Sequence, residues 1–130
     1  MTPDLVALLC AVLLAAVQLA LYAVPGNLDL GVKYTAGPRD EPPDGLSVTT
    51  KRIKRAYENH LETLPWFAIA VLVAHMTGQA DGVTAAASWT YLAGRVMYIP
   101  LYVFGVPFLR SAVWAVATGA ILTIVLRTLL

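Results

Sequence analysis

Four residues that could bind an anion share one face of a predicted helix. Arg52, Arg55, Asn59 and Glu62 follow the spacing i, i+3, i+7, i+10. At about 100° per residue, their side chains fall within a sector of about 80°. Guanidinium groups bind carboxylates and a carboxylate binds an ammonium group. The stripe therefore predicts a site for a small anion, or for a zwitterion with several carboxylates and one ammonium group.

A second polar face follows further along the chain, and it consists of Tyr91, Arg95, Tyr98 and Tyr102. Their spacing, i, i+4, i+7, i+11, places them within about 60°. Arg95 lies nine residues before the end of an apolar run, or about 14 Å at 1.5 Å per residue. This depth is too great for comfortable snorkelling, so Arg95 needs an internal partner, and we expect Glu62.

Arg110 opens the last apolar run, just after Pro107. It could be a positive-inside anchor or a functional cation. The polar groups could likewise be structural glue between helices, each hydrogen bond contributing about 1 kcal/mol, or an unfilled anion site. Polar groups that only hold helices together need one partner for each charge, whereas here four arginines (52, 55, 95 and 110) accompany one carboxylate, Glu62. This surplus favours the anion site.

Neighbouring charges lie off the stripe. We expect Lys54 and His60 to face lipid headgroups, and Glu58, at the margin, to form a surface ion pair with Lys54 or Lys51.

The elements that carry these residues are apolar and long. The chain has 130 residues, of which 58% are hydrophobic, so we expect an all-α integral membrane protein. Four spans over residues 4–24, 51–78, 83–104 and 108–130 predict an antiparallel four-helix bundle within one domain, 1–130. A signal peptide is the alternative for the first span, but the only charge ahead of its apolar run, Leu5 to Val24, is the negative charge of Asp4. Residues 25–50, rich in Pro and Gly, predict a polar loop that could hold a lid or a partner-binding element.

The second span carries polar groups into the bilayer. Its apolar part, Leu64 to Gly78, has 15 residues, and a crossing needs about 20. Counting back from Gly78 reaches Asn59, so Asn59 and Glu62 lie at the bilayer edge, where a carboxylate is costly.

Charge sets the expected orientation. Most lysines and arginines fall between the first two spans, so we expect that loop to be cytoplasmic and both termini non-cytoplasmic. If the protein is bacterial, its membrane is the inner one. The net charge of +1 gives no sign of a nucleic-acid partner. With one cysteine, Cys10, no thiolate metal site is expected.

The two stripes and Arg110 resemble a known family. The stretch RAYENHLE (55–62) resembles the R-A-x-x-N-x-x-E signature of the MAPEG family, the membrane-associated proteins in eicosanoid and glutathione metabolism. Arg95 and Tyr98, with Tyr102, are similar to its R-x-x-[HY]-x-x-x-Y pattern, and Arg110-Ser111 to its fourth-helix arginine. The resemblance covers residues 50–130.

The resemblance implies a homotrimer that binds glutathione between subunits near the cytoplasmic side, and a transferase or peroxidase acting on lipophilic electrophiles from the bilayer. Arg110 would stabilise the thiolate, which is the nucleophile. No metal is implied. Glutathione would be contacted by the family positions Arg55, Asn59, Glu62, Arg95, Tyr98 and Tyr102, to which the stripe adds Arg52.

Two positions depart from the family pattern. Thr63 stands where a relative has tyrosine, and the basic residue near the end of the first helix has only Lys33 and Arg39 as candidates. The alternative function is a non-catalytic accessory or assembly subunit of a larger membrane complex, whose polar faces serve as glue or bind a lipid headgroup.

Overall fold

The computed structural model describes residues 1–38 and 45–130, and this part of the chain is helical, with no strand. The helices are α1 (Pro3–Leu30), α2 (Val32–Thr35), α3 (Val48–Met76), α4 (Gly82–Val103) and α5 (Pro107–Leu129). The predicted all-α class is confirmed.

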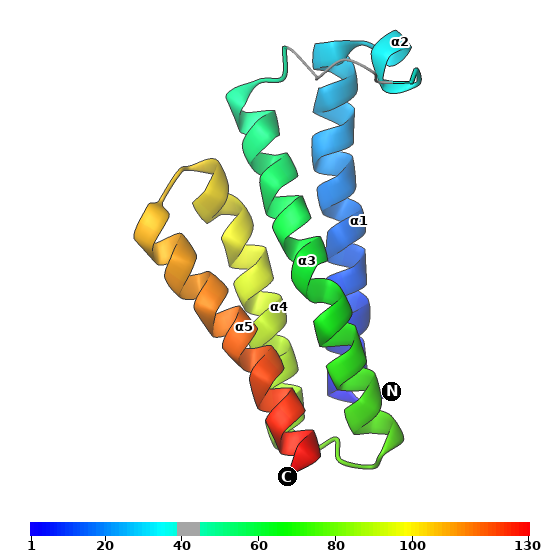
Figure 1. Ribbon diagram of the computed structural model, residues 1–130, viewed down its shortest axis with the longest axis vertical. Coiled ribbons are helices and arrows are strands. Elements are labelled where there is room, and N and C mark those ends of the chain that lie inside the picture. The colour runs from blue at the N-terminus through cyan, green and yellow to red at the C-terminus, as the bar shows by residue number, and fades with distance from the viewer. Residues whose placement is uncertain (39–44) are drawn as a thin grey trace.

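The four long helices lie side by side and alternate in direction (Figure 1). α1 packs on α3 and α4, α4 packs on α5, and α3 contacts both α4 and α5. Both termini lie at one end of the molecule. At the opposite end, the pair α1 and α3 separates from the pair α4 and α5 (Figure 1).

The core is built largely from small side chains. Buried alanines such as Ala7, Ala11 and Ala74 let the helices approach closely. At Gly94, a Cβ atom would lie 3.1 Å from the Cβ of Ala117, so α4 and α5 approach closely at this glycine. The outer surface carries large apolar side chains, including Leu13, which is 64% exposed. Such a surface suits lipid.

Two of the described helices, α1 and α5, are long and apolar enough to cross a membrane. α3 begins with a charged segment, and α4 carries polar side chains. The crossing of the bilayer by α3 and α4, and with it the four-span bundle, stays a prediction.

The end of the first helix differs from the expectation. We expected the helix to stop at Val24, but α1 continues through Pro25 to Leu30. It ends at Gly31, whose φ of 84° is readily adopted only by glycine. Asp29 then joins α1 to α3, since its Oδ2 accepts hydrogen bonds from the Ser47 amide (3.1 Å) and the Thr50 hydroxyl (3.4 Å).

The expected polar loop is therefore shorter than 25–50. Its first part belongs to α1 and α2. Arg39, and the segment 39–44 where a lid or partner-binding element was expected, lie outside the described residues.

Candidate functional site

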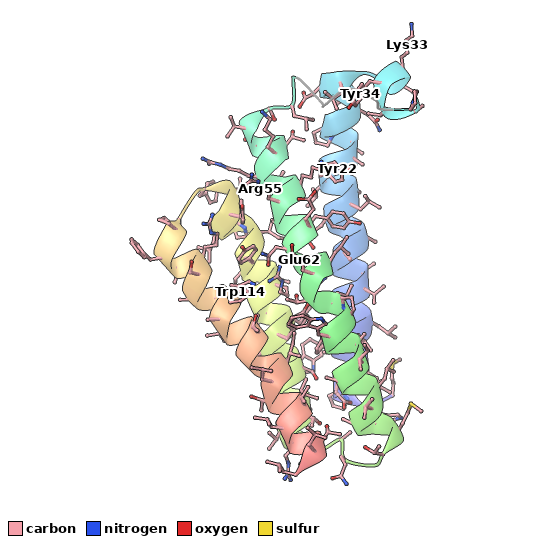
Figure 2. The ribbon with its side chains drawn as sticks, in the orientation of Figure 1. Tyr22, Lys33, Tyr34, Arg55, Glu62 and Trp114 are labelled. Carbon is pink, nitrogen blue, oxygen red and sulfur yellow. The ribbon has the colours of Figure 1, made fainter. Side chains whose placement is uncertain are left out.

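An open cleft lies between α3, α4 and α5, in the half of the molecule where the two helix pairs separate. Its volume is about 460 Å³, and it is lined by Arg55, Glu58, Asn59, Glu62, Tyr98, Tyr102, Arg110, Ser111 and Trp114. Figure 2 labels Arg55 and Glu62 on α3 and Trp114 on α5. The cleft brings together six of the eight residues that the sequence suggested; Arg52 and Arg95 are not among its lining residues.

The α3 wall of the cleft follows from helical periodicity. Arg55, Asn59 and Glu62 recur at every third or fourth position of one continuous helix, so they face the same way. Arg55 and Glu62 are exposed and Asn59 is half-buried. Their polar groups are therefore accessible to a ligand in the cleft.

Arg52, one turn before Arg55, has a different role in this fold. Its Nη1 donates a 2.8 Å hydrogen bond to the carbonyl oxygen of Val103, in the last turn of α4. The final carbonyls of a helix have no partner within the helix and carry partial negative charge, which a guanidinium neutralises. Arg52 thus joins the start of α3 to the end of α4, and its contact with a ligand stays a prediction.

Arg95 is 1% exposed and bonds a partner other than the one we expected. Its Nη2 donates to Oδ1 of Asn59 at 3.0 Å, and its guanidinium lies 4.6 Å from the centre of the Tyr98 ring. No ion pair between Arg95 and Glu62 occurs in the described part of the chain, so that expectation was wrong. Because Asn59 takes the arginine, the exposed Glu62 carboxylate remains available to the cleft.

Arg110 forms part of the α5 wall of the cleft. The chain turns at Gly105 and re-enters a helix at Pro107, which places Arg110 in the first turn of α5. Its guanidinium lies 4.6 Å from the centre of the Tyr102 ring, a cation–π contact that restrains its position. Within residues 1–38 and 45–130, Arg110 has no carboxylate partner.

Three lining residues were missing from the sequence-based site. Glu58 was expected in a surface pair with Lys54, and that pair is present at 3.8 Å, but Glu58 also lines the cleft. Trp114 lies one turn beyond Arg110, so the i, i+4 spacing could have suggested it. Ser111 donates a 3.2 Å hydrogen bond to the carbonyl oxygen of Pro107.

With Glu58 present, the cleft carries two arginines and two glutamates. The predicted surplus of arginines is therefore absent among the residues that line the cleft. Cations and carboxylates in one cleft suit a zwitterion better than a simple anion. In the described residues, no group of three or more His, Cys, Asp or Glu is placed to hold a metal ion.

The expectation that His60 faces lipid headgroups was wrong. His60 is fully buried, and its Nε2 lies 2.9 Å from the carbonyl oxygen of Ala11 on α1. Spacing on a single helix could not reveal this contact, because α1 covers that side of α3. Lys54 also faces α1, with its Nζ 5.8 Å from the centre of the Tyr22 ring.

Comparison with known protein families decides the relationship. The model of the MAPEG family matches residues 7–130. The chain belongs to the MAPEG family. No curated protein and no solved structure matches it. Membership confirms the resemblance and supports, in general terms, a membrane protein of glutathione or eicosanoid metabolism.

Proposed function

We propose that this MAPEG protein is a membrane-embedded glutathione-dependent transferase or peroxidase, and that the cleft is its glutathione site. The observation that carries the proposal is the gathering of six predicted residues around one cleft of mixed charge. Glutathione has two carboxylates, one ammonium group and a thiol. The two guanidinium groups can pair with anionic groups of glutathione, and one of the two glutamates can pair with its ammonium group.

Six lining residues of the cleft have a role in this proposal. Arg55 binds a carboxylate of glutathione and Glu62 binds its ammonium group, while Asn59 and the hydroxyls of Tyr98 and Tyr102 supply further hydrogen bonds. Arg110, held against the Tyr102 ring, faces the sulfur. A nearby cation lowers the pKa of a thiol and so favours the thiolate.

The reaction then needs no metal. The thiol loses its proton to solvent, and the thiolate attacks an electrophilic carbon, forming a C–S bond as the leaving group departs with its electron pair. With a hydroperoxide, the thiolate attacks the terminal oxygen, an S–O bond forms as the O–O bond breaks, and the alkoxide takes a proton from solvent and leaves as the alcohol. A second glutathione thiol then attacks the sulfenic sulfur, which forms the disulfide and releases water.

The surroundings of the cleft support a lipophilic second substrate. Phe108 is 89% exposed and Trp114 is 41% exposed, so large apolar groups lie close to Arg110 along α5. We propose that the electrophile reaches the sulfur from the bilayer, along a homotrimer interface that completes the open cleft. The spans would place the cleft near the cytoplasmic side.

One observation favours the second candidate, a non-catalytic accessory or assembly subunit. The Asn59–Arg95 bond and the Arg52–Val103 bond are both contacts between helices. They are what polar glue would provide. In this candidate Arg110, which has no carboxylate partner among the described residues, would serve only as a positive-inside anchor.

Replacement of Arg110 tests the catalytic role. In Arg110→Ala the bound thiol returns to only a few per cent thiolate at neutral pH. The conjugation rate should therefore fall about 10-fold or more, while the glutathione Kd changes much less. Conjugation kinetics and calorimetric titration in detergent measure the two quantities.

Lys51→Ala is the control, because it removes one exposed positive charge of α3 outside the cleft. Its rate should equal that of the wild type. An Arg110→Ala protein with wild-type rate would exclude the proposed role.

A further inference from the structure

A buried chain of polar groups lies next to the cleft without lining it. His60 and Thr63 come from α3, Tyr91 from α4 and the Ala11 carbonyl from α1. His60 and Tyr91 are 0% exposed and Thr63 is 5% exposed. The Tyr91 hydroxyl lies 3.3 Å from Nδ1 of His60 and 3.0 Å from the Thr63 hydroxyl. We call these three side chains the relay.

With His60 neutral, the Ala11 carbonyl decides which ring nitrogen carries the hydrogen. This carbonyl only accepts, so Nε2 of His60, 2.9 Å away, is the donor, and Nδ1 is left to accept from the Tyr91 hydroxyl. The Tyr91 oxygen can then accept from the Thr63 hydroxyl. That hydroxyl also lies 3.3 Å from the His60 carbonyl oxygen, a second acceptor for its single hydrogen, so the bonds of the relay depend on one another.

The relay fixes α3 and α4 where they carry the Asn59–Arg95 bond. His60 directly follows Asn59, and Tyr91 lies one helical turn before Arg95. The Tyr91 ring also stacks on Phe67 at 4.1 Å, which holds the ring in place. A shift of either helix would break hydrogen bonds in a buried environment, where unpaired polar groups are costly.

We propose that His60 and Tyr91 are positioning residues for the Asn59–Arg95 bond, and through Asn59 for ligand binding in the cleft. The step from Asn59 to glutathione rests on the proposed function; the step from the relay to Arg95 does not. None of the relay residues lines the cleft, so they act on it through the placement of α3 and α4, and the Asn59–Arg95 bond is the contact by which this placement is followed.

Tyr91→Phe tests the inference, since it removes one hydroxyl and keeps the stacked ring. We expect the glutathione Kd to rise about 5- to 10-fold, with the rate at saturating glutathione within about 2-fold of wild type. Thr90→Val is the matched control. It removes the neighbouring hydroxyl on α4, which is exposed and bonds only the Ala86 carbonyl among the described residues.

Substitutions of His60 separate positioning from packing. In His60→Gln, the amide can donate to Ala11 and accept from Tyr91, so it should bind glutathione nearly as the wild type does. His60→Leu can do neither and should behave like Tyr91→Phe. If Tyr91→Phe does not fold, Thr63→Val, which removes the first donor of the relay, replaces it in the comparison.

A second measurement needs no ligand. Nitrogen-15 NMR of the protein in micelles follows the solvent exchange of the Arg95 Nη2 hydrogens, one of which is donated to Asn59. This exchange should be slow in wild type, Thr90→Val and His60→Gln, and faster in Tyr91→Phe and His60→Leu. Unchanged exchange in Tyr91→Phe overturns the inference whatever the ligand does. Faster exchange with an unchanged glutathione Kd overturns the link to the ligand. A wild type that fails to bind glutathione overturns the proposed function instead. The exchange data alone then decide whether the relay positions Arg95.

Discussion

At the scale of single residues, spacing predicted which side chains share a helix face but not which atoms they bond. The 3.6-residue period is enough to bring Arg55, Asn59 and Glu62 to one wall of the cleft. The partners of Arg52 and Arg95 depend instead on where a second helix lies. A single sequence gives no such distance, so the Asn59–Arg95 bond could not be foreseen.

The Asn59–Arg95 bond predicts strong coupling between the two residues. Asn59→Ala leaves a buried guanidinium without this hydrogen bond and should lower the free energy of unfolding by about 1.5–3 kcal/mol. In Arg95→Met the same substitution of Asn59 should cost much less, because no buried charge remains to be satisfied. Denaturant unfolding in micelles gives the four free energies of a double-mutant cycle. Strictly additive losses would show that the bond contributes little.

At the scale of elements, helix ends explain both the correct and the incorrect boundaries. The polar residues Asn27 and Asp29 suggested a loop, yet both lie in the last turn of α1. The backbone carbonyl of Asn27 accepts the ordinary helical bond from the Gly31 amide at 2.9 Å, and the Asp29 side chain binds the start of α3. Composition could not distinguish a loop from the end of a helix here, because the contact that decides it joins Asp29 to Ser47, which is 18 residues further along the chain.

The opposite end of the molecule is held by Asp81. Its Oδ1 accepts from the amides of Val83 (2.9 Å) and Thr84 (3.0 Å), which caps α4. Its Oδ2 lies 2.7 Å from Nη2 of Arg127, near the end of α5. The hydrogen bond from the Thr84 amide, followed by that from Arg127, lowers the pKa of Asp81 below its ordinary value.

This shift predicts a loss of stability in acid. Because the folded-state pKa is depressed, the stabilisation is present above the unfolded-state value of about 3.9 and disappears as the pH falls through the lower folded-state value. Thermal unfolding of the protein between pH 6 and pH 2 should therefore show a declining Tm that is flatter in Asp81→Asn. Arg127→Met should flatten it partly, since the backbone donors remain. Parallel curves for wild type and Asp81→Asn would contradict this assignment.

At the scale of the whole molecule, composition was the most informative property. A chain that is 58% hydrophobic predicted helices with an apolar exterior, and large side chains such as Leu13 and Trp66 are indeed exposed on the surface. Composition cannot predict how helices pair, and so it missed the burial of His60 beneath α1. The homotrimer and the cytoplasmic position of the cleft remain proposals. Neither follows from composition, because the contacts between subunits depend on surfaces that composition does not describe.

The central claim is that the cleft binds glutathione and ionises its thiol. Titration of glutathione into the purified wild-type protein in detergent, followed by the ultraviolet absorbance of the thiolate, tests this directly. We predict saturable binding below millimolar glutathione with a rise in thiolate absorbance at neutral pH. Absence of binding at millimolar glutathione would contradict the claim and favour the accessory-subunit function.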